Sequence, residues 1–404
     1  ERSGGAVRLR ASCRPDNRAR RKGREMRAWC SVGHYLQGVD VIGRVGRYAS
    51  MFGKNHLFLV DSFVCQMLGE GLYGAYPSLD GCTYRTLTFE GEISHKSISR
   101  LSNEAGGEFD VIVAVGGGKV IDVAKMVAAQ SCAALVVCPT IAATDAPTSA
   151  MSILYSDEGE MNEIALHVKN PDLVLVDSRI IASAPTRFLS AGIGDALSTY
   201  YEGESNWKTG HANYVWCQSE QAVGTAAGRA IARACMETLE RDGRAAVKAC
   251  EQSTVTPALE NVIEANILMS GIGFENVGCS LAHGLGNAMT VLPDGEKSMH
   301  GERVGFSTLS LMIAEDYPSE EVERVARFCR DCGVPTTFSE LSLAPSDDDL
   351  RKVAQAAMQA ESWGASPVRL CDVEQRGSCS RTPSPSRSTP SMYRRDLSQP
   401  FLTT

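Results

Sequence analysis

Four short apolar runs in the first half of the chain predict strands that are buried on both faces. These runs are HLFLVD from His56, VIVAVGGG from Val111, ALVVCPT from Ala134 and NPDLVLVD from Asn170. None of them shows the apolar and polar alternation of a half-exposed strand, and segments of helical length separate them. The pattern therefore predicts a parallel sheet covered by helices, which ends near Asp177.

The pattern changes after Pro185. Long stretches rich in small residues follow, such as QAVGTAAGRAIARACMETLERDG and PALENVIEANILMSGIGFENVG, and strand-like runs disappear. This sequence pattern predicts a helical second domain. The expected fold is an α/β N-terminal domain with a parallel, Rossmann-like sheet, followed by an all-helical C-terminal domain.

The two ends of the chain differ from the middle. Residues 1–27 hold ten Lys and Arg against three acidic residues, whereas the rest holds 30 basic and 45 acidic residues of the totals of 40 and 48. We expect 1–27 to be a disordered basic extension, with an organelle transit peptide as the alternative. Residues 364–404 are rich in Ser, Pro and Arg and predict a disordered tail. This leaves 28–184 as a nucleotide-binding domain and 185–363 as a helical domain.

Composition narrows the functional class. An acidic body is a poor match for a phosphate backbone, so we expect no nucleic-acid partner. The 404 residues contain no run of 18 uncharged apolar residues and no apolar signal core, which predicts no membrane association and a cytoplasmic protein. A chain of this length does not need disulfides, so its 14 cysteines are expected to be reduced. Cys329 and Cys332 form a single CxxC that ends a helical segment, which argues against a redox or zinc motif.

The glycine triplet Gly116 to Gly118 is the first candidate for chemistry. It follows a buried strand and begins a helix, where free backbone N–H groups and the helix dipole favour a phosphate. It matches neither the GxGxxG nor the P-loop spacing, so a tight turn without a ligand stays open. Asp61 closes an earlier strand and could accept the ribose hydroxyls of NAD, or it could simply cap a helix.

Several motifs in order carry a family resemblance. They are VIVAVGGGKVIDVAK, CPTIAATDAPTSAMSILY, NPDLVLVD with APTRFLSAGIGDALSTYYE, VTPALENVIEANILMSGIGFE, and AHGLGNAMTVL with KSMHGERV. Together they resemble the glycerol dehydrogenases, the zinc-dependent branch of the iron-containing alcohol dehydrogenase superfamily, over about residues 32 to 360. The resemblance implies a dehydroquinate synthase-like architecture of two domains, with the active site between them.

The resemblance also implies a set of site residues and a reaction. The metal ligands, which are catalytic as well, would be Asp195, His283 and His300, and Asp145 would touch the hydroxyls of the substrate. The implied NAD contacts are Asp61, Gly117, Gly118, Lys119, Asp122, Thr140, Thr144, Ser149, Met151 and Tyr155. The implied reaction is metal-assisted hydride transfer from glycerol to NAD, which gives dihydroxyacetone.

Residue chemistry alone supports these ligands only in part. One aspartate and two histidines suit a catalytic Zn²⁺, but their spacings of 88 and 17 residues carry no local signal, and buried structural histidines are the ordinary alternative. Iron-type relatives place a histidine one turn after the metal aspartate, where this chain has Thr199, and the resemblance therefore favours zinc. The aspartate, and the weakly charged segment around Asp145, argue against dehydroquinate synthase.

One departure keeps other functions open. The closing helices of the family are expected to be replaced by the Ser- and Pro-rich tail, although they belong to the domain that supports the site. The alternatives are a related NAD and metal enzyme for another diol or for glycerol-1-phosphate, and a non-catalytic relative that binds nucleotide. The resemblance further implies a homo-oligomer, commonly an octamer.

Overall fold

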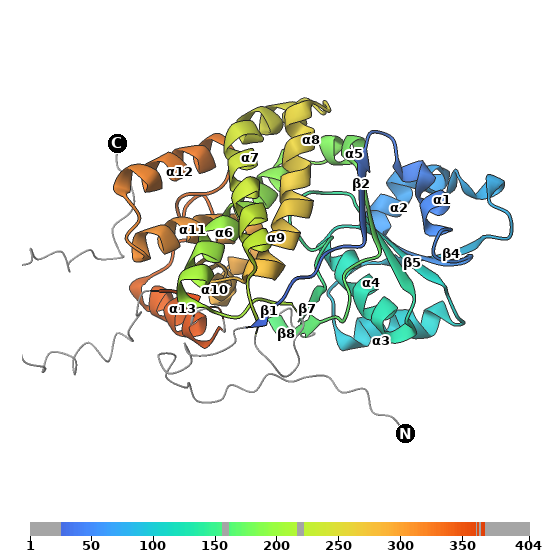
Figure 1. Cartoon of the computed structure of the whole chain (residues 1–404), viewed down its shortest axis with the longest axis horizontal. Helices are drawn as coiled ribbons and strands as arrows, with labels where there is room; N and C mark the ends of the chain where they lie inside the picture. The colour runs from blue at the N-terminus through green and yellow to red at the C-terminus, as the bar shows by residue number, and fades with distance from the viewer. Residues whose placement is uncertain (1–25, 156–160, 216–221, 361, 363–364, 368–404) are drawn as a thin grey trace, which may run out of the picture.

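The protein has a sheet domain on one side and a helical domain on the other (Figure 1). The structure is a computed structural model and describes residues 26–155, 161–215, 222–360, 362 and 365–367. In Figure 1 the sheet domain runs from blue to green, and the helical domain runs from light green to red. The predicted combination of an α/β N-terminal domain with a helical C-terminal domain is confirmed.

Six parallel strands form the main sheet. In spatial order they are β2 (His34–Gly38), β9 (Leu173–Asp177), β6 (Ala134–Pro139), β5 (Val111–Gly116), β3 (Asn55–Asp61) and β4 (Thr83–Phe89). The four inner strands are the predicted ones. Pattern analysis missed β2 and β4 because they are edge strands, which expose side chains along their length and so lack a continuous apolar run.

Both faces of the sheet are buried, which explains the continuous apolar runs. Along β3, Leu57 and Leu59 enter a core shared with α4 and the helical domain, whereas Phe58 and Val60 enter a second core on the opposite face. Alternate residues of a strand point to opposite faces, so each position of an inner strand must be apolar. The helices of this domain are α1 (Val45–Ala49), α2 (Ser62–Leu68), α3 (His95–Ala105), α4 (Gly118–Ser131) and α5 (Ser178–Ser183).

A small antiparallel hairpin, β7 (Met151–Tyr155) and β8 (Met161–Leu166), packs on α4. The Ser152 hydroxyl donates to the carbonyl oxygen of Asp122 at 3.1 Å, and the Ile153 amide donates to the Asp122 carboxylate at 3.0 Å. These contacts fix the hairpin beside the helix that follows the glycine triplet.

The helical domain is built around α6 and α11. Its helices are α6 (Thr186–Thr209), α7 (Ala226–Glu251), α8 (Pro257–Glu264), α9 (Ser270–Val277), α10 (Leu281–Ala288), α11 (His300–Ala314), α12 (Ser319–Asp331) and α13 (Asp347–Gln359). A π-helical turn, Ala265–Met269, joins α8 to α9. No helix among the described residues is both long and apolar enough to cross a membrane. The ten cysteines in the described part of the chain are all unpaired.

Most of both terminal segments lies outside the described residues. Of the expected basic extension, Met26 and Arg27 form β1, which pairs in parallel with β10 (Ala222–Val223). Of the expected tail, 365–367 are described, and the hydroxyl of Thr209 donates to the carbonyl oxygen of Ala365 at 3.1 Å.

Candidate active site

Three side chains that are distant in sequence converge where α6, α10 and α11 meet. Asp195 lies within α6, His283 lies in the first turn of α10, and His300 is the first residue of α11. The Nε2 atoms of His283 and His300 lie 3.6 Å and 3.3 Å from Oδ1 of Asp195. The centroids of the two imidazole rings are 5.2 Å apart. The structure therefore brings together the three residues that the resemblance proposed as metal ligands.

Glycines let the backbones of α6 and α11 approach closely enough for this convergence. A Cβ atom on Gly301 would lie 2.0 Å from the carbonyl oxygen of Ala191, and one on Gly194 would lie 2.4 Å from the carbonyl oxygen of Gly301. Packed atoms cannot approach so closely, so a side chain at either position would push the helices apart. Because Gly301 follows His300 and Gly194 precedes Asp195, this contact sets the separation of two members of the trio.

The trio has the properties of a metal-binding centre. Asp195 is 1% exposed, and neither of its carboxylate oxygens has a hydrogen-bond partner among the described residues. A buried carboxylate without donors is costly unless a positive charge compensates it. One ligand atom from each of the three residues lies within 4.8 Å of the other two. Ligands of a tetrahedral zinc ion, each about 2 Å from the metal, lie roughly 3.3 Å apart, so these residues fit a divalent metal.

The charges of the trio stabilise one another. Burial opposes ionisation of Asp195, yet the charges of His300 and His283 hold the pKa of Asp195 below its usual range. Burial also opposes protonation of His283, but Cys279 and Glu202 raise the pKa of His283 well above its usual value. Positive charge on the neighbouring imidazoles thus favours the ionised carboxylate of Asp195, and a bound cation would supply such a charge as well.

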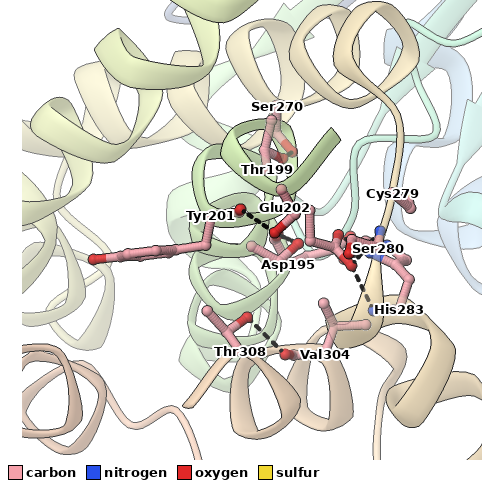
Figure 2. Close-up of polar contacts among 12 residues, drawn as sticks. Asp195, Thr199, Tyr201, Glu202, Ser270, Cys279, Ser280, His283, Val304 and Thr308 are labelled. Atoms are coloured by element: carbon pink, nitrogen blue, oxygen red, sulfur yellow. Dashed lines mark hydrogen bonds and ion pairs between the residues drawn. The ribbon is translucent and has the colours of Figure 1, made fainter. Parts of the chain in front are cut away.

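Glu202 orients His283 from the same helix that carries Asp195 (Figure 2). Its Oε2 accepts from Nδ1 of His283 at 2.6 Å, and its Oε1 accepts from the backbone N–H groups of Ser280 and His283 at 2.7 and 2.8 Å. A proton held on Nδ1 leaves Nε2 free to bind a cation. Sequence reasoning missed Glu202, although its position seven residues after Asp195, two turns along one helix face, was a usable signal.

Arg303 shapes the loop between the two helices that carry the histidines. Its buried guanidinium donates Nε to the carbonyl oxygen of Gly286 and Nη1 to that of Gly295, both at 3.0 Å, and Nη1 also donates to the carbonyl oxygen of Ser298. Burial lowers the pKa of Arg303. These bonds tie the end of α10 to the start of α11, so Arg303 holds His300 in register with the rest of the site. Nothing in the sequence singled this arginine out.

Asp145 lies at the end of a short chain of hydroxyl groups. Thr199, one turn after Asp195 on α6, has its Oγ1 3.1 Å from the hydroxyl of Ser270, which donates to Oδ2 of Asp145 at 2.8 Å. Because Ser270 donates to Asp145, Thr199 must donate to Ser270. Burial raises the pKa of Asp145 to about 8, and the charge of Asp195 adds to the shift. The Thr199 hydroxyl is thus engaged in a chain of hydrogen bonds that ends at Asp145.

The segment from Ala142 to Ala150, which contains Asp145, is held by the helical domain. Nδ2 of Asn266 donates to the carbonyl oxygen of Ala142 at 3.0 Å, and the backbone N–H of Ala150 donates to the Glu275 carboxylate at 2.8 Å. The hydroxyl of Thr148 donates at 3.0 Å to a backbone carbonyl of the π-helical turn. Such turns are frequent at functional sites because they free backbone groups for other contacts. The segment therefore keeps a fixed position relative to the metal-binding trio.

The glycine triplet forms an open helix terminus. Gly116 has φ of +154°, and Gly117 precedes α4 without any side-chain cap. A Cβ atom on Gly118 would lie 3.5 Å from the methyl group of Thr144, and the amide of Thr140 donates to the carbonyl oxygen of Gly116 at 3.1 Å. The predicted contacts Gly117, Gly118, Thr140 and Thr144 thus lie together around a helix N-terminus that can bind an anion.

Asp61 performs the capping role that the sequence left open. Its Oδ1 accepts from the backbone N–H groups of Phe63 and Val64 at 2.9 and 3.1 Å, at the start of α2. A Cβ atom on Gly116 would lie 3.0 Å from that of Asp61, so the aspartate borders the glycine triplet. Its second oxygen, Oδ2, has no hydrogen bond to a described residue and could accept one from a ligand.

The carboxylate of Asp122 is hydrogen-bonded to other groups of the protein, namely the Lys125 ammonium and the Ile153 amide, rather than exposed to a ligand. Lys125 donates to Asp122 at 3.0 Å, to the hydroxyl of Ser149 at 3.2 Å and to the carbonyl oxygen of Met151 at 2.6 Å. Burial raises the pKa of Asp122, and the charge of Lys125 opposes this shift. Three of the predicted cofactor residues are thereby joined through one lysine. Sequence reasoning missed this role of Lys125, which closes the motif VIDVAK three residues after Asp122.

The remaining two predicted cofactor residues flank this network. Lys119 forms an ion pair with Glu92, and its side chain is largely exposed. Tyr155 ends β7, where its backbone N–H donates to the carbonyl oxygen of Ile93 at 2.7 Å. Burial raises the pKa of Tyr155. Lys119 lies in the first turn of α4, which begins at the glycine triplet, and Tyr155 lies in the hairpin that packs on α4.

The chain is similar to proteins of known family. Residues 33–178 match the family described as iron-containing alcohol dehydrogenase. The chain is 40% identical over 333 residues to the glycerol dehydrogenase of Thermotoga maritima, and this match covers 80% of this chain and 88% of that protein. It is 39% identical over 329 residues to the glycerol dehydrogenase of Escherichia coli, covering 81% of this chain and 88% of that protein.

A solved structure agrees with these sequence matches. The crystal structure of glycerol dehydrogenase from Schizosaccharomyces pombe has a TM-score of 0.81 to this chain at 34% identity, and the match covers 86% of this chain and 88% of that one. Coverage of this extent includes residues of both domains. The chain therefore belongs to the iron-containing alcohol dehydrogenase family, and the three relatives described above are glycerol dehydrogenases.

Proposed function

We propose that the protein oxidises glycerol to dihydroxyacetone with NAD⁺ as the hydride acceptor and Zn²⁺ as the bound metal. The similarity to glycerol dehydrogenases over most of the chain supports the reaction. The observation that carries the proposal is the convergence of Asp195, His283 and His300, in which a buried carboxylate without hydrogen-bond donors faces two imidazole nitrogens.

The ligand set favours zinc among divalent metals. Asp195, His283 and His300 supply one oxygen and two nitrogens, which is an established first shell for catalytic zinc with a position left for substrate. Thr199, the position of a further ligand in iron-type relatives, has its hydroxyl bonded to Ser270 instead. A metal ion held by the trio would polarise a substrate hydroxyl and lower its pKa.

The chain's own residues would orient the substrate. Asp145 lies close enough to Asp195 for their charges to interact, and its carboxyl group can hold a second hydroxyl of a vicinal diol. Ser270 fixes that carboxyl group by donating to Oδ2, which leaves Oδ1 for the substrate. Oxidation removes a hydride from C2 and the proton from its hydroxyl, and it yields dihydroxyacetone, NADH and one proton. Correct placement of the reacting carbons is a large part of such catalysis.

The dinucleotide would lie across the glycine triplet. The backbone N–H groups at the start of α4, from Gly118 onward, would bind the pyrophosphate, and Oδ2 of Asp61 would accept ribose hydroxyls. Ser149, Met151 and Tyr155 would form the side nearer the nicotinamide. Lys125 donates to the Ser149 hydroxyl and to the Met151 carbonyl oxygen, and Glu275 of the helical domain accepts from the Ala150 amide, so the cofactor would meet a rigid segment.

We further propose the domain limits 28–184 and 185–363 and a homo-oligomeric assembly, an octamer by family resemblance. The sheet ends with β9 at Asp177, and α6 begins at Thr186. These positions support a boundary between the last short helix of the first domain and the first long helix of the second.

An assay of NAD⁺ reduction with a panel of polyols tests the proposed function. We expect turnover with glycerol, loss of turnover after chelation, and recovery when Zn²⁺ is restored. Asp195→Ala and His283→Ala should each abolish metal-dependent turnover, whereas His34→Ala, a histidine on the edge strand β2, should retain it. Unchanged turnover in Asp195→Ala would refute the ligand assignment, and turnover only with another diol would refute the substrate.

A further inference from the structure

His283 presents its two ring nitrogens to two different groups of side chains. Nε2 lies on the side of Asp195, at 3.6 Å, and Nδ1 lies 2.6 Å from Oε2 of Glu202. A third potential ligand, Cys279, precedes His283 by four residues at the entrance to α10. Figure 2 shows Cys279 on the chain that leads into α10, His283 in the first turn of that helix, and Glu202 reaching His283 from α6.

The second group is compact and buried. A carboxylate oxygen of Glu202, the sulfur of Cys279 and a ring nitrogen of His283 all lie within 4.8 Å of one another. Glu202 is 1% exposed and Cys279 is 7% exposed. Ser280 is fully buried next to Cys279, and its hydroxyl has no hydrogen-bond partner among the described residues. Four polar groups thus gather in a place where water has little access.

The ligand types select a class of cation. Thiolate, imidazole and carboxylate together suit soft or borderline divalent ions such as Cd²⁺ and Zn²⁺ rather than Mg²⁺ or Ca²⁺. Oε1 of Glu202 already accepts two backbone N–H groups, but Oε2 contacts only Nδ1 of His283 among the described residues. Oxygen and nitrogen ligands of one tetrahedral ion lie roughly 3.3 Å apart. Oε2 of Glu202 and Nδ1 of His283 are 2.6 Å apart, so these two atoms would have to move slightly away from each other to bind a cation.

We propose that Glu202, Cys279 and His283 form a second metal site, which takes a soft divalent cation and inhibits the enzyme. Binding replaces the proton on Nδ1 of His283 and the proton on the Cys279 sulfur, and both protons pass to solvent. The hydrogen bond by which Glu202 orients His283 is then lost, which changes the surroundings of this zinc ligand and lowers turnover while zinc stays bound. Inhibition rests on the proposed dehydrogenase function, whereas cation binding does not.

Cadmium titration of the zinc-loaded full chain tests this site. CdCl₂ is added while cadmium–thiolate absorption in the near ultraviolet, retained zinc and NAD⁺ reduction are measured. The matched variants are Cys279→Ser and Cys132→Ser, the latter at an exposed cysteine at the end of α4. We expect half-inhibition of wild type and Cys132→Ser at roughly 10- to 100-fold lower Cd²⁺ than in Cys279→Ser. The absorption band of the bound ion should be lost only in Cys279→Ser, and zinc should stay bound in wild type.

Equal inhibition of Cys279→Ser and wild type, or release of one zinc per cadmium bound, would overturn the inference, since cadmium would then act at Asp195 and His300. If Cys279→Ser fails to fold, Cys279→Ala serves in its place. Cadmium-113 NMR of the unmodified protein gives an independent result, because a sulfur ligand moves the resonance downfield of a site with only nitrogen and oxygen. Absence of a resonance from sulfur-bound cadmium also refutes the site. The resonance and the cadmium–thiolate absorption are both independent of turnover, so they test cation binding even if the proposed function is wrong.

Discussion

Replacing Glu202 with glutamine tests how the protein prepares His283 for a metal. The substitution keeps the size of the side chain, so the backbone N–H groups of Ser280 and His283 still require an oxygen acceptor at the position of Oε1. The amide nitrogen must then take the position of Oε2, facing Nδ1 of His283 at 2.6 Å in the native protein. Because an amide nitrogen only donates, Nδ1 must accept and the imidazole proton must move to Nε2.

The expected magnitude follows from that change of tautomer. Nε2 faces Asp195, so a proton there competes directly with the metal ion. Loss of an outer hydrogen-bond partner typically weakens metal binding about 10- to 100-fold, which corresponds to about 1.4 to 2.7 kcal/mol. The metal-free protein should unfold at nearly the same denaturant concentration as wild type, because both backbone hydrogen bonds to residue 202 are kept.

The assay is competition for Zn²⁺ between the protein and a chromophoric chelator, followed by kcat and KM at saturating zinc. Glu315→Gln is the matched control, since the Glu315 side chain is also buried but contacts the Ser205 hydroxyl and Lys208 rather than a histidine. We expect weakened zinc binding in Glu202→Gln and unchanged binding in the control. Zinc affinity of Glu202→Gln within about twofold of wild type would refute the reasoning, because Glu202 would not set the tautomer.

Three further results are expected. Lys125→Met should destabilise the protein by about 3 to 5 kcal/mol in denaturant titrations, because it leaves the buried Asp122 carboxylate without its partner, and removing that charge as well with Asp122→Asn should recover part of the loss. Ser270→Ala should raise KM for glycerol roughly 5- to 100-fold through misplacement of Asp145, with zinc affinity unchanged in the chelator assay. The folded pKa of Asp145 is about 8, above the ordinary value of about 3.9, so the metal-free protein should lose stability between about pH 4 and pH 8 at up to about 1.4 kcal/mol per pH unit. Asp145→Asn should flatten this slope in unfolding measurements, and an unchanged slope would contradict the assignment.

The buried sheet and the helical domain were predictable from local pattern. Inner strands such as β5 need apolar residues at every position because a different core covers each face of the sheet. The result is a run of consecutive apolar residues, which can be recognised in the sequence. Edge strands such as β2 carry no such requirement and were missed. The hairpin of β7 and β8 was also missed, since its position depends on contacts with α4.

The sequence by itself determined the type of each inner element, the glycine triplet between strand and helix, and, through family resemblance, the identity of the three metal-binding candidates. Only the tertiary structure decided that Asp195, His283 and His300 meet, because close packing of Gly194 and Gly301 joins helices that are far apart in the chain. It also assigned supporting roles to Glu202 and Lys125. Hydrophobic periodicity reports which face of an element is buried, whereas hydrogen bonds between distant elements depend on how those faces come together.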